Sequence, residues 1–176
     1  SLVVTNCNFS NNRVGWSADN SSQFGGAIAT WNTALGVQGC RFEGNYSQMS
    51  FKVVYGGAIY TRGGTVNITD SLFTNNYSQV RMNNGGAADE AYGGALSIQD
   101  AISARIADSI FVGNRAIGYT ANGGTVYLDN HTSTIVMTTV VERCVFDGYV
   151  PDLSSYCNVF QQDGGLLYMT NCLISR

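Results

Sequence analysis

Residues 56–76 read GGAIYTRGGTVNITDSLFTNN, and the motifs at the two ends of this stretch decide the fold. The first is Gly-Gly-Ala-Ile at residues 56–59, and the second is Phe-x-x-Asn at residues 73–76. The two motifs alternate along the whole chain. Self-similarity with a period of about 20 to 50 residues is typical of solenoids and other repeat arrays.

Each motif occurs five times, and its last copy is altered. The phenylalanines are spaced 31 to 38 residues apart, and they are Phe9, Phe42, Phe73, Phe111 and Phe146. The asparagines three residues after the first four are Asn12, Asn45, Asn76 and Asn114. The glycine pairs begin at Gly25, Gly56, Gly93, Gly123 and Gly164, and the large apolar residues that follow them are Ile28, Ile59, Leu96, Val126 and Leu167.

Apolar residues precede each phenylalanine with the period of two that marks a half-buried strand. In the second copy they are Leu35 and Val37, seven and five residues before Phe42. A cysteine or serine stands two residues before each phenylalanine, so the parity slips and a bend is expected between two short strands. The expected bends are Thr5-Asn6, Gln38-Gly39, Thr69-Asp70, Ala107-Asp108 and Glu142-Arg143.

With a third strand from the glycine motif, the repeat predicts an all-β parallel β-helix of about five coils, each of three short strands. Successive coils lie about 4.8 Å apart, so equivalent side chains form ladders. We expect the five phenylalanines to form an interior stack and the asparagines to line the following turn, where Asn tolerates a left-handed backbone. A β-propeller needs four strands per blade, and a leucine-rich repeat needs a leucine pattern that is absent here.

The composition agrees with this fold and excludes several classes of function. The chain has 176 residues, with 21 glycines, one proline and 12% charged residues, and 44% are hydrophobic. Its net charge is −3 and Lys52 is its single lysine, which argues against nucleic-acid binding. No apolar run is long enough for a membrane-spanning helix. We expect one β-helix segment over residues 1–176, cut from a longer solenoid and less regular after residue 146.

The alternation of Gly-Gly-Ala-(Ile/Leu/Val) with Phe-x-x-Asn, from Val3 to about Leu167, resembles the repeat of the chlamydial polymorphic outer-membrane proteins. This resemblance implies a right-handed parallel β-helix that is exposed at the cell surface and acts mainly in adhesion. The family brings no catalytic residues that could be placed on this chain. The last copy departs from the pattern, because Tyr149 stands where the other copies have asparagine.

Six Asn-x-(Ser/Thr) sequons are candidate N-glycosylation sites in a secreted protein. Two of them, Asn45 and Asn76, belong to the predicted asparagine ladder, where an inward amide could not carry a sugar. The other four should face solvent on strands or lie in loops, and these predicted acceptors are Asn8, Asn20, Asn67 and Asn130.

The five cysteines leave several pairings open. Cys7 and Cys40 occupy equivalent positions in consecutive coils, Cys144 and more loosely Cys172 share this position, and Cys157 lies in an expected loop. Stacked Cα atoms about 4.8 Å apart fall in the range of disulfides, but parallel side chains point the same way. The alternatives are a buried stack of thiols, a Cys7–Cys40 bridge, and a bridge from Cys157 to Cys144 or Cys172. No Cys/His spacing indicates a metal site, and no cofactor is expected.

Parallel β-helices also carry pectin-degrading enzymes, whose chemistry needs clustered carboxylates, with a Ca²⁺ site and a basic arginine in lyases or paired acids in hydrolases. The best candidates in this chain are Asp70 and Asp108, which stack in adjacent coils, and Arg143, which follows them. The same positions suit a solvated bend, where aspartate is common. The single histidine, His131, lies in a polar loop and gives no catalytic pattern.

The segments between each phenylalanine and the next glycine pair vary in length, and we expect them to be loops that carry recognition. They hold Trp16 and Phe24, Met49 and Phe51, residues 82–92 and residues 149–160. We therefore predict a structural and adhesive protein, extracellular or at the cell surface, that forms a stiff stalk or fibre segment. Its expected partners are a surface or matrix protein or glycan, or further copies in a filament, and no nucleic acid. The alternative is a polysaccharide lyase or hydrolase on a pectate-lyase-like β-helix.

Overall fold

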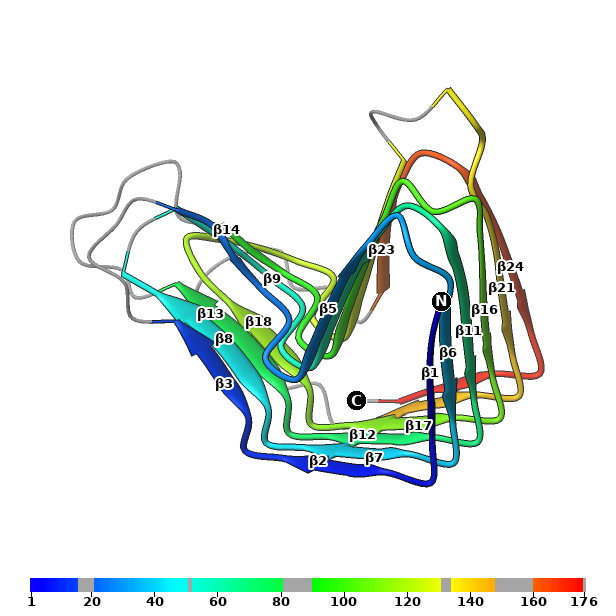
Figure 1. Cartoon of the computed structure of the whole chain (residues 1–176), viewed down its shortest axis with the longest axis horizontal. Helices are drawn as coiled ribbons and strands as arrows, with labels where there is room; N and C mark the ends of the chain where they lie inside the picture. The colour runs from blue at the N-terminus through cyan, green and yellow to red at the C-terminus, as the bar shows by residue number, and fades with distance from the viewer. Residues whose placement is uncertain (16–20, 51, 81–89, 131–133, 148–159, 176) are drawn as a thin grey trace.

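The computed structural model describes residues 1–15, 21–50, 52–80, 90–130, 134–147 and 160–175. These residues form strands, turns and bends, and none of them belongs to a helix that could cross a membrane. Strands from successive repeats pair in parallel and build five sheets, which we call A to E in the order in which the chain visits them. The predicted all-β parallel β-helix is confirmed (Figure 1).

Sheets A, B and E surround the larger part of each coil. Sheet A contains β1 (Leu2–Thr5), β6 (Leu35–Gln38), β11 (Thr65–Thr69), β16 (Ser103–Ala107), β21 (Thr138–Glu142) and β24 (Leu166–Thr170). Sheet B contains β2 (Asn8–Ser10), β7 (Arg41–Glu43), β12 (Leu72–Thr74), β17 (Ile110–Val112), β22 (Val145–Asp147) and β25 (Leu173–Ile174). Sheet E contains β5 (Ile28–Trp31), β10 (Ile59–Arg62), β15 (Leu96–Gln99), β20 (Val126–Asp129) and β23 (Phe160–Asp163).

Two further sheets lie in the segments that were expected to be loops. Sheet C contains β3 (Arg13–Gly15), β8 (Tyr46–Met49), β13 (Tyr77–Val80) and β18 (Arg115–Ile117). Sheet D contains β4 (Gln23–Phe24), β9 (Val53–Tyr55), β14 (Glu90–Tyr92) and β19 (Thr120–Asn122). A complete coil therefore has five strands, and the prediction of three was wrong. The reason is that strands of two to four residues here bury mostly small side chains and leave little periodicity to detect.

The bend between sheets A and B is one left-handed residue in every coil, at the positions where the parity slips. These residues have φ between 51° and 62°, and they are Asn6, Gly39, Asp70, Asp108, Arg143 and Asn171. The cysteine or serine that follows uses its side chain to satisfy backbone groups at the bend: Ser71 Oγ donates to Thr69 O at 2.7 Å and accepts from the Cys40 N–H at 3.2 Å. This position therefore requires a small side chain that both donates and accepts.

The main core lies between sheets A, B and E and is organised by the phenylalanine stack. The rings of Phe9, Phe42, Phe73, Phe111 and Phe146 lie in register, with neighbouring centroids 4.7–4.9 Å apart and planes within 10° of parallel. Next to this stack, the first three ladder asparagines each donate from Nδ2 to the Oδ1 of the asparagine in the following coil, at 2.8–3.0 Å. Asn45 and Asn76 are fully buried.

The glycine pairs bring two sides of the coil together at the backbone. A Cβ built on Gly57 would lie 2.0 Å from Gly94 O and 2.5 Å from the carbonyl carbon of Tyr77 in β13. Gly26 and Gly94 approach the neighbouring strands of sheet C in the same way. Because the obstacles are backbone atoms, these positions accept only glycine. We call this line of contact the neck.

The neck divides the cross-section into two lobes (Figure 1). The main lobe holds the large core, whereas sheets C and D form a second lobe with a small core. That small core consists of Met49, Val54, Val80, Ala91, Ala116 and Ala121.

The fifth glycine pair does not belong to the glycine motif, so its predicted alignment was wrong. Phe160 of β23 pairs with Val126 and takes the place expected for Leu167, which instead pairs with Thr139 in sheet A. Gly164 and Gly165, with φ of 79° and 77°, thus lie in the turn from sheet E to sheet A. Among the residues expected in loops, Phe24, Met49 and Tyr92 lie in strands, and Trp16, Phe51, Met82 and Tyr149 lie outside the described residues.

Candidate functional site

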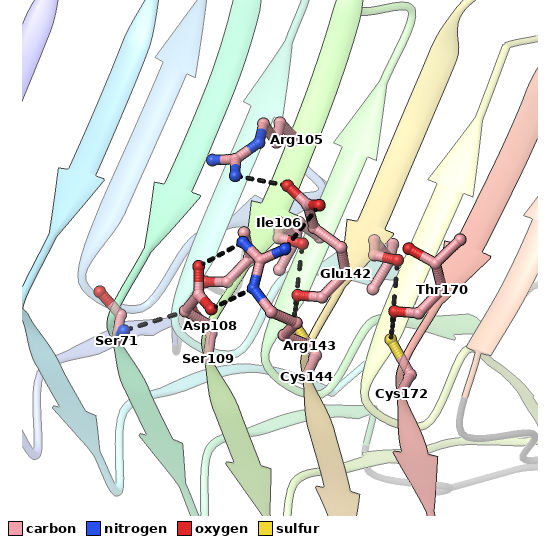
Figure 2. Close-up of polar contacts among 12 residues, drawn as sticks. Ser71, Arg105, Ile106, Asp108, Ser109, Glu142, Arg143, Cys144, Thr170 and Cys172 are labelled. Atoms are coloured by element: carbon pink, nitrogen blue, oxygen red, sulfur yellow. Dashed lines mark hydrogen bonds and ion pairs between the residues drawn. The ribbon is translucent and has the colours of Figure 1, made fainter.

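Two of the three catalytic candidates meet in an ion-pair network on the outer surface (Figure 2). Arg143 donates from Nε and Nη2 to the two carboxylate oxygens of Asp108, at 2.6 and 2.8 Å. Its Nη1 donates to Glu142 at 2.8 Å, and Glu142 also accepts a hydrogen bond from Arg105. The network thus links β16, β21 and the bends that follow them in two adjacent coils.

The electrostatics of this network suit cross-linking better than proton transfer. The hydrogen bond from Arg143 lowers the pKa of Asp108, and those from Arg105 and then Arg143 lower the pKa of Glu142. The two carboxylates in turn raise the pKa of Arg143. A general acid or base works best with a pKa near the operating pH. In this network the pKa values of Asp108, Glu142 and Arg143 are all shifted away from neutral pH.

Asp70, the third candidate, stays outside this network. It occupies the equivalent bend one coil earlier, and its backbone N–H donates to Ala107 O at 3.2 Å. Its side chain is exposed and makes no ion pair with any described residue. The three candidates therefore share one ladder of bends, but only the side chains of Asp108 and Arg143 come together.

The described cysteines are free thiols, and all of them follow the left-handed bend: Cys7, Cys40, Cys144 and Cys172. The N–H of Cys7 donates to Cys40 Sγ at 3.4 Å, in the manner described above for serine. Burial raises the pKa of the Cys144 thiol to about 11, so this thiol is protonated at neutral pH. Cys157 lies outside the described residues, and the described part shows no His/Cys/Asp/Glu group that could hold a metal ion.

The structure sorts the sequons by exposure. Asn8 on β2 and Asn67 on β11 are exposed, whereas Asn45 and Asn76 are buried in their ladder. Asn130 is half-buried rather than exposed, and its Oδ1 is buried without a hydrogen-bond partner among the described residues. Asn20 lies outside the described residues.

An aromatic cluster fills the outer angle between the two lobes, and the sequence analysis missed it. It consists of Phe24, Trp31, Tyr55, Tyr60, Tyr92 and Tyr127, and we call it the aromatic wedge. Contacting rings have centroids 4.6–5.7 Å apart. Although Tyr60 points away from the main core, it is only 1% exposed, while Trp31 at the rim is 50% exposed. In the sequence, an aromatic residue directly precedes three of the glycine pairs, and this pattern could have indicated the wedge. These residues are Phe24, Tyr55 and Tyr92.

Polar groups border the aromatic wedge on the sheet E side. Tyr60 OH donates to Gln99 at 2.9 Å, and Tyr127 OH donates to Asp163 at 3.0 Å. Asp129 accepts from Gln99 at 3.3 Å and pairs in register with Asp163 of the next coil. Burial raises the pKa of Tyr60 to about 12 and also raises that of Tyr127, so both hydroxyls remain donors. Two carboxylates in adjacent coils thus lie beside a buried aromatic surface.

No protein-family model matches the chain, and no curated protein or solved structure matches it either. The class of the protein follows from the geometry above: it is a parallel β-helix repeat protein.

Proposed function

We propose that this protein is a structural and adhesive β-helix, a stiff stalk or fibre segment that acts outside the cell and displays variable links. The observation that carries the proposal is the continuity of its ladders. The phenylalanine stack passes through five coils, and backbone pairing in sheets A and B continues through six strands. A solenoid whose successive coils are hydrogen-bonded through five sheets is a rigid scaffold.

The links between sheets C and D support the display function. They leave the same corner in successive coils but differ in length, running over residues 16–22, 50–52, 81–89 and 118–119. Variable links on a constant scaffold are where repeat proteins commonly carry recognition. The resemblance to the polymorphic outer-membrane proteins supports a cell-surface location, and Asn8 and Asn67 offer exposed acceptors for glycans in a secretory host.

A bead assay tests the adhesive role. Beads coated with the protein should attach to cells more often than uncoated beads. Replacing residues 81–89 by Gly-Tyr, the link of the fourth coil, should reduce attachment by at least about half while the thermal midpoint of unfolding stays unchanged. A control with Val3→Thr on the outer face of sheet A should attach normally. Attachment equal to that of uncoated beads would show that the adhesive proposal is wrong.

The paired carboxylates Asp129 and Asp163 favour a second candidate, a polysaccharide hydrolase or lyase. Paired acids beside aromatic rings are an arrangement that glycosidases use. The test is incubation with uronate polymers and neutral glycans, with and without Ca²⁺, followed by measurement of new reducing ends or unsaturated products. Turnover that disappears in Asp129→Asn and Asp163→Asn but persists in Asp70→Asn would establish this candidate in place of the adhesive one.

A further inference from the structure

The outer face of sheet C has a chemistry unlike the rest of this acidic protein. Its four strands read RVG, YSQM, YSQV and RAI, with two arginines and no acidic residue. The strand register places Arg13, Tyr46, Tyr77 and Arg115 in one row across four coils. We call this row the arginine–tyrosine row.

The row is a continuous stack. The rings of Tyr46 and Tyr77 are 4.8 Å apart and within 6° of parallel. The guanidinium carbon of Arg13 lies 5.5 Å from the ring centroid of Tyr46, and that of Arg115 lies 5.6 Å from the ring centroid of Tyr77. Both arginines are exposed and both tyrosines are half-exposed. The ring faces are therefore covered by their neighbours in the row, so this surface presents ring edges together with exposed guanidinium groups.

Further polar groups adjoin the row on the same sheet. Gln48 and Gln79 form a second row, with Gln48 Nε2 donating to Gln79 Oε1 at 3.0 Å. Lys52 is exposed in the link that follows β8. Gln48 is buried and Gln79 is half-buried, so the surface combines cationic donors at both ends of the row with the amide of Gln79, which can bind hydroxyl groups.

We propose that the outer face of sheet C binds an anionic polysaccharide, carboxylated or sulfated, that lies across the strands along the axis of the solenoid. This inference rests on the proposed adhesive function and names the class of its partner. Guanidinium groups suit carboxylate and sulfate oxygens. The row spans three coil spacings, roughly 14 Å, which is longer than one sugar ring.

Two other polymers fit this surface less well. Single-stranded nucleic acid binds aromatic residues by stacking bases on free ring faces, and the ring faces of this row are covered. An added peptide strand needs the backbone groups of a sheet edge, whereas this surface is the face of a paired sheet. A sugar polymer needs only the cationic donors and the Gln79 amide that the surface presents.

Binding of the whole chain to immobilised heparin, polygalacturonate and neutral dextran tests this inference. The unaltered protein should bind at least one anionic polymer, more weakly as salt rises, and should not bind dextran. The double variant Arg13→Gln/Arg115→Gln should bind at least about tenfold more weakly. A matched control, Arg41→Gln/Arg62→Gln, removes the same charge from other faces and should bind within about twofold of the unaltered protein.

A conservative pair of substitutions keeps the test independent of folding. Tyr46→Phe/Tyr77→Phe retains the stacked rings and removes the hydroxyls, and it should weaken binding a few-fold. Binding to heparin alone identifies sulfate as the recognised group, and binding to polygalacturonate alone identifies carboxylate. No binding to either polymer, or equal weakening in both arginine double variants, overturns the inference. Because purified glycans are used, that result leaves the adhesive proposal to its own bead assay.

Discussion

The two lobes of this solenoid show two ways of building a β-helix core. The main lobe stacks large identical rings, so each coil must repeat the one before it, and Phe42, Phe73, Phe111 and Phe146 are all at most 1% exposed. The second lobe is filled by Ala, Val and Met, and its strands are joined by links of different length. A core of large stacked residues therefore enforces the repeat, whereas a core of small residues tolerates variation.

The largest expected effect comes from truncating one residue in each core. Phe73→Ala should lower the free energy of unfolding by about 4 kcal/mol, because it removes a ring that contacts two neighbouring rings. Val54→Ala in the second lobe should cost about 2 kcal/mol, since it removes two methyl groups. Urea unfolding measures both values. Equal losses would mean that the two cores contribute alike and that the comparison is wrong.

A slightly smaller effect is expected at the neck. Gly57→Ala should cost about 3 kcal/mol, because the new methyl group would overlap backbone atoms of Gly94 and Tyr77. Gly36 on sheet A is the matched control, since its Cβ would meet only the Val3 side chain, at 3.6 Å. Gly36→Ala should leave stability within about 1 kcal/mol. A tolerated Gly57→Ala would show that the lobes can separate at the neck.

Alkaline titration should reveal the aromatic wedge that joins the lobes. The pKa of Tyr60 is raised in the folded state to about 12, so its stabilising contribution is complete below the unfolded value of 10.0 and is lost as the pH rises towards 12. Tyr60→Phe should cost about 1 kcal/mol at neutral pH and reduce the loss above pH 10. Tyr168→Phe, at an exposed tyrosine, should leave the stability at neutral pH unchanged. The absorbance of tyrosinate follows the titration, and a single midpoint near 10 for all tyrosines would contradict the prediction.

The smallest effect is expected from the ion-pair network of the main lobe. The pKa of Asp108 is lowered in the folded state, so its contribution is complete above the ordinary value of 3.8 and is lost as the pH falls below it. Asp108→Asn should therefore remove a slight acid dependence of the thermal midpoint, which high salt should also remove, because the pair is exposed. Asp70→Asn, which removes a carboxylate without an ion pair among the described residues, is the matched control. A salt-independent profile would contradict this account.

The main lobe could be predicted from the sequence because its signals are large and regularly spaced. The phenylalanine stack, the asparagine ladder and the bends at Asn6 and Asp108 are all present in the structure. The second lobe could have been suspected from the repeated Tyr-Ser-Gln at residues 46–48 and 77–79. Its short strands of small residues have no hydrophobic period, however, so the sequence alone predicts loops there.

The candidate sites were less predictable, because they depend on side chains brought together between coils. The spacing placed Asp108 and Arg143 in one ladder, but it could not show that their side chains pair while Asp70 stays apart. The aromatic wedge joins sheets D and E around the outside of the neck. The coil narrows at Gly57, and this narrowing brings Tyr55 and Tyr60 into contact, which the spacing of these residues in the sequence does not indicate.

The asparagine ladder also gives the solenoid a direction. In its first three members Nδ2 donates to the Oδ1 of the asparagine in the following coil, so the row is a chain of aligned amide dipoles. Nδ2 of Asn114, the last member, donates to Phe73 O. Asn114 is 1% exposed, whereas Asn12 at the other end of the row is exposed, so a second copy could meet the ladder at Asn12. Two copies that met there head to head would oppose two acceptor oxygens, so the ladder favours a polar arrangement of copies over a symmetric dimer at this end.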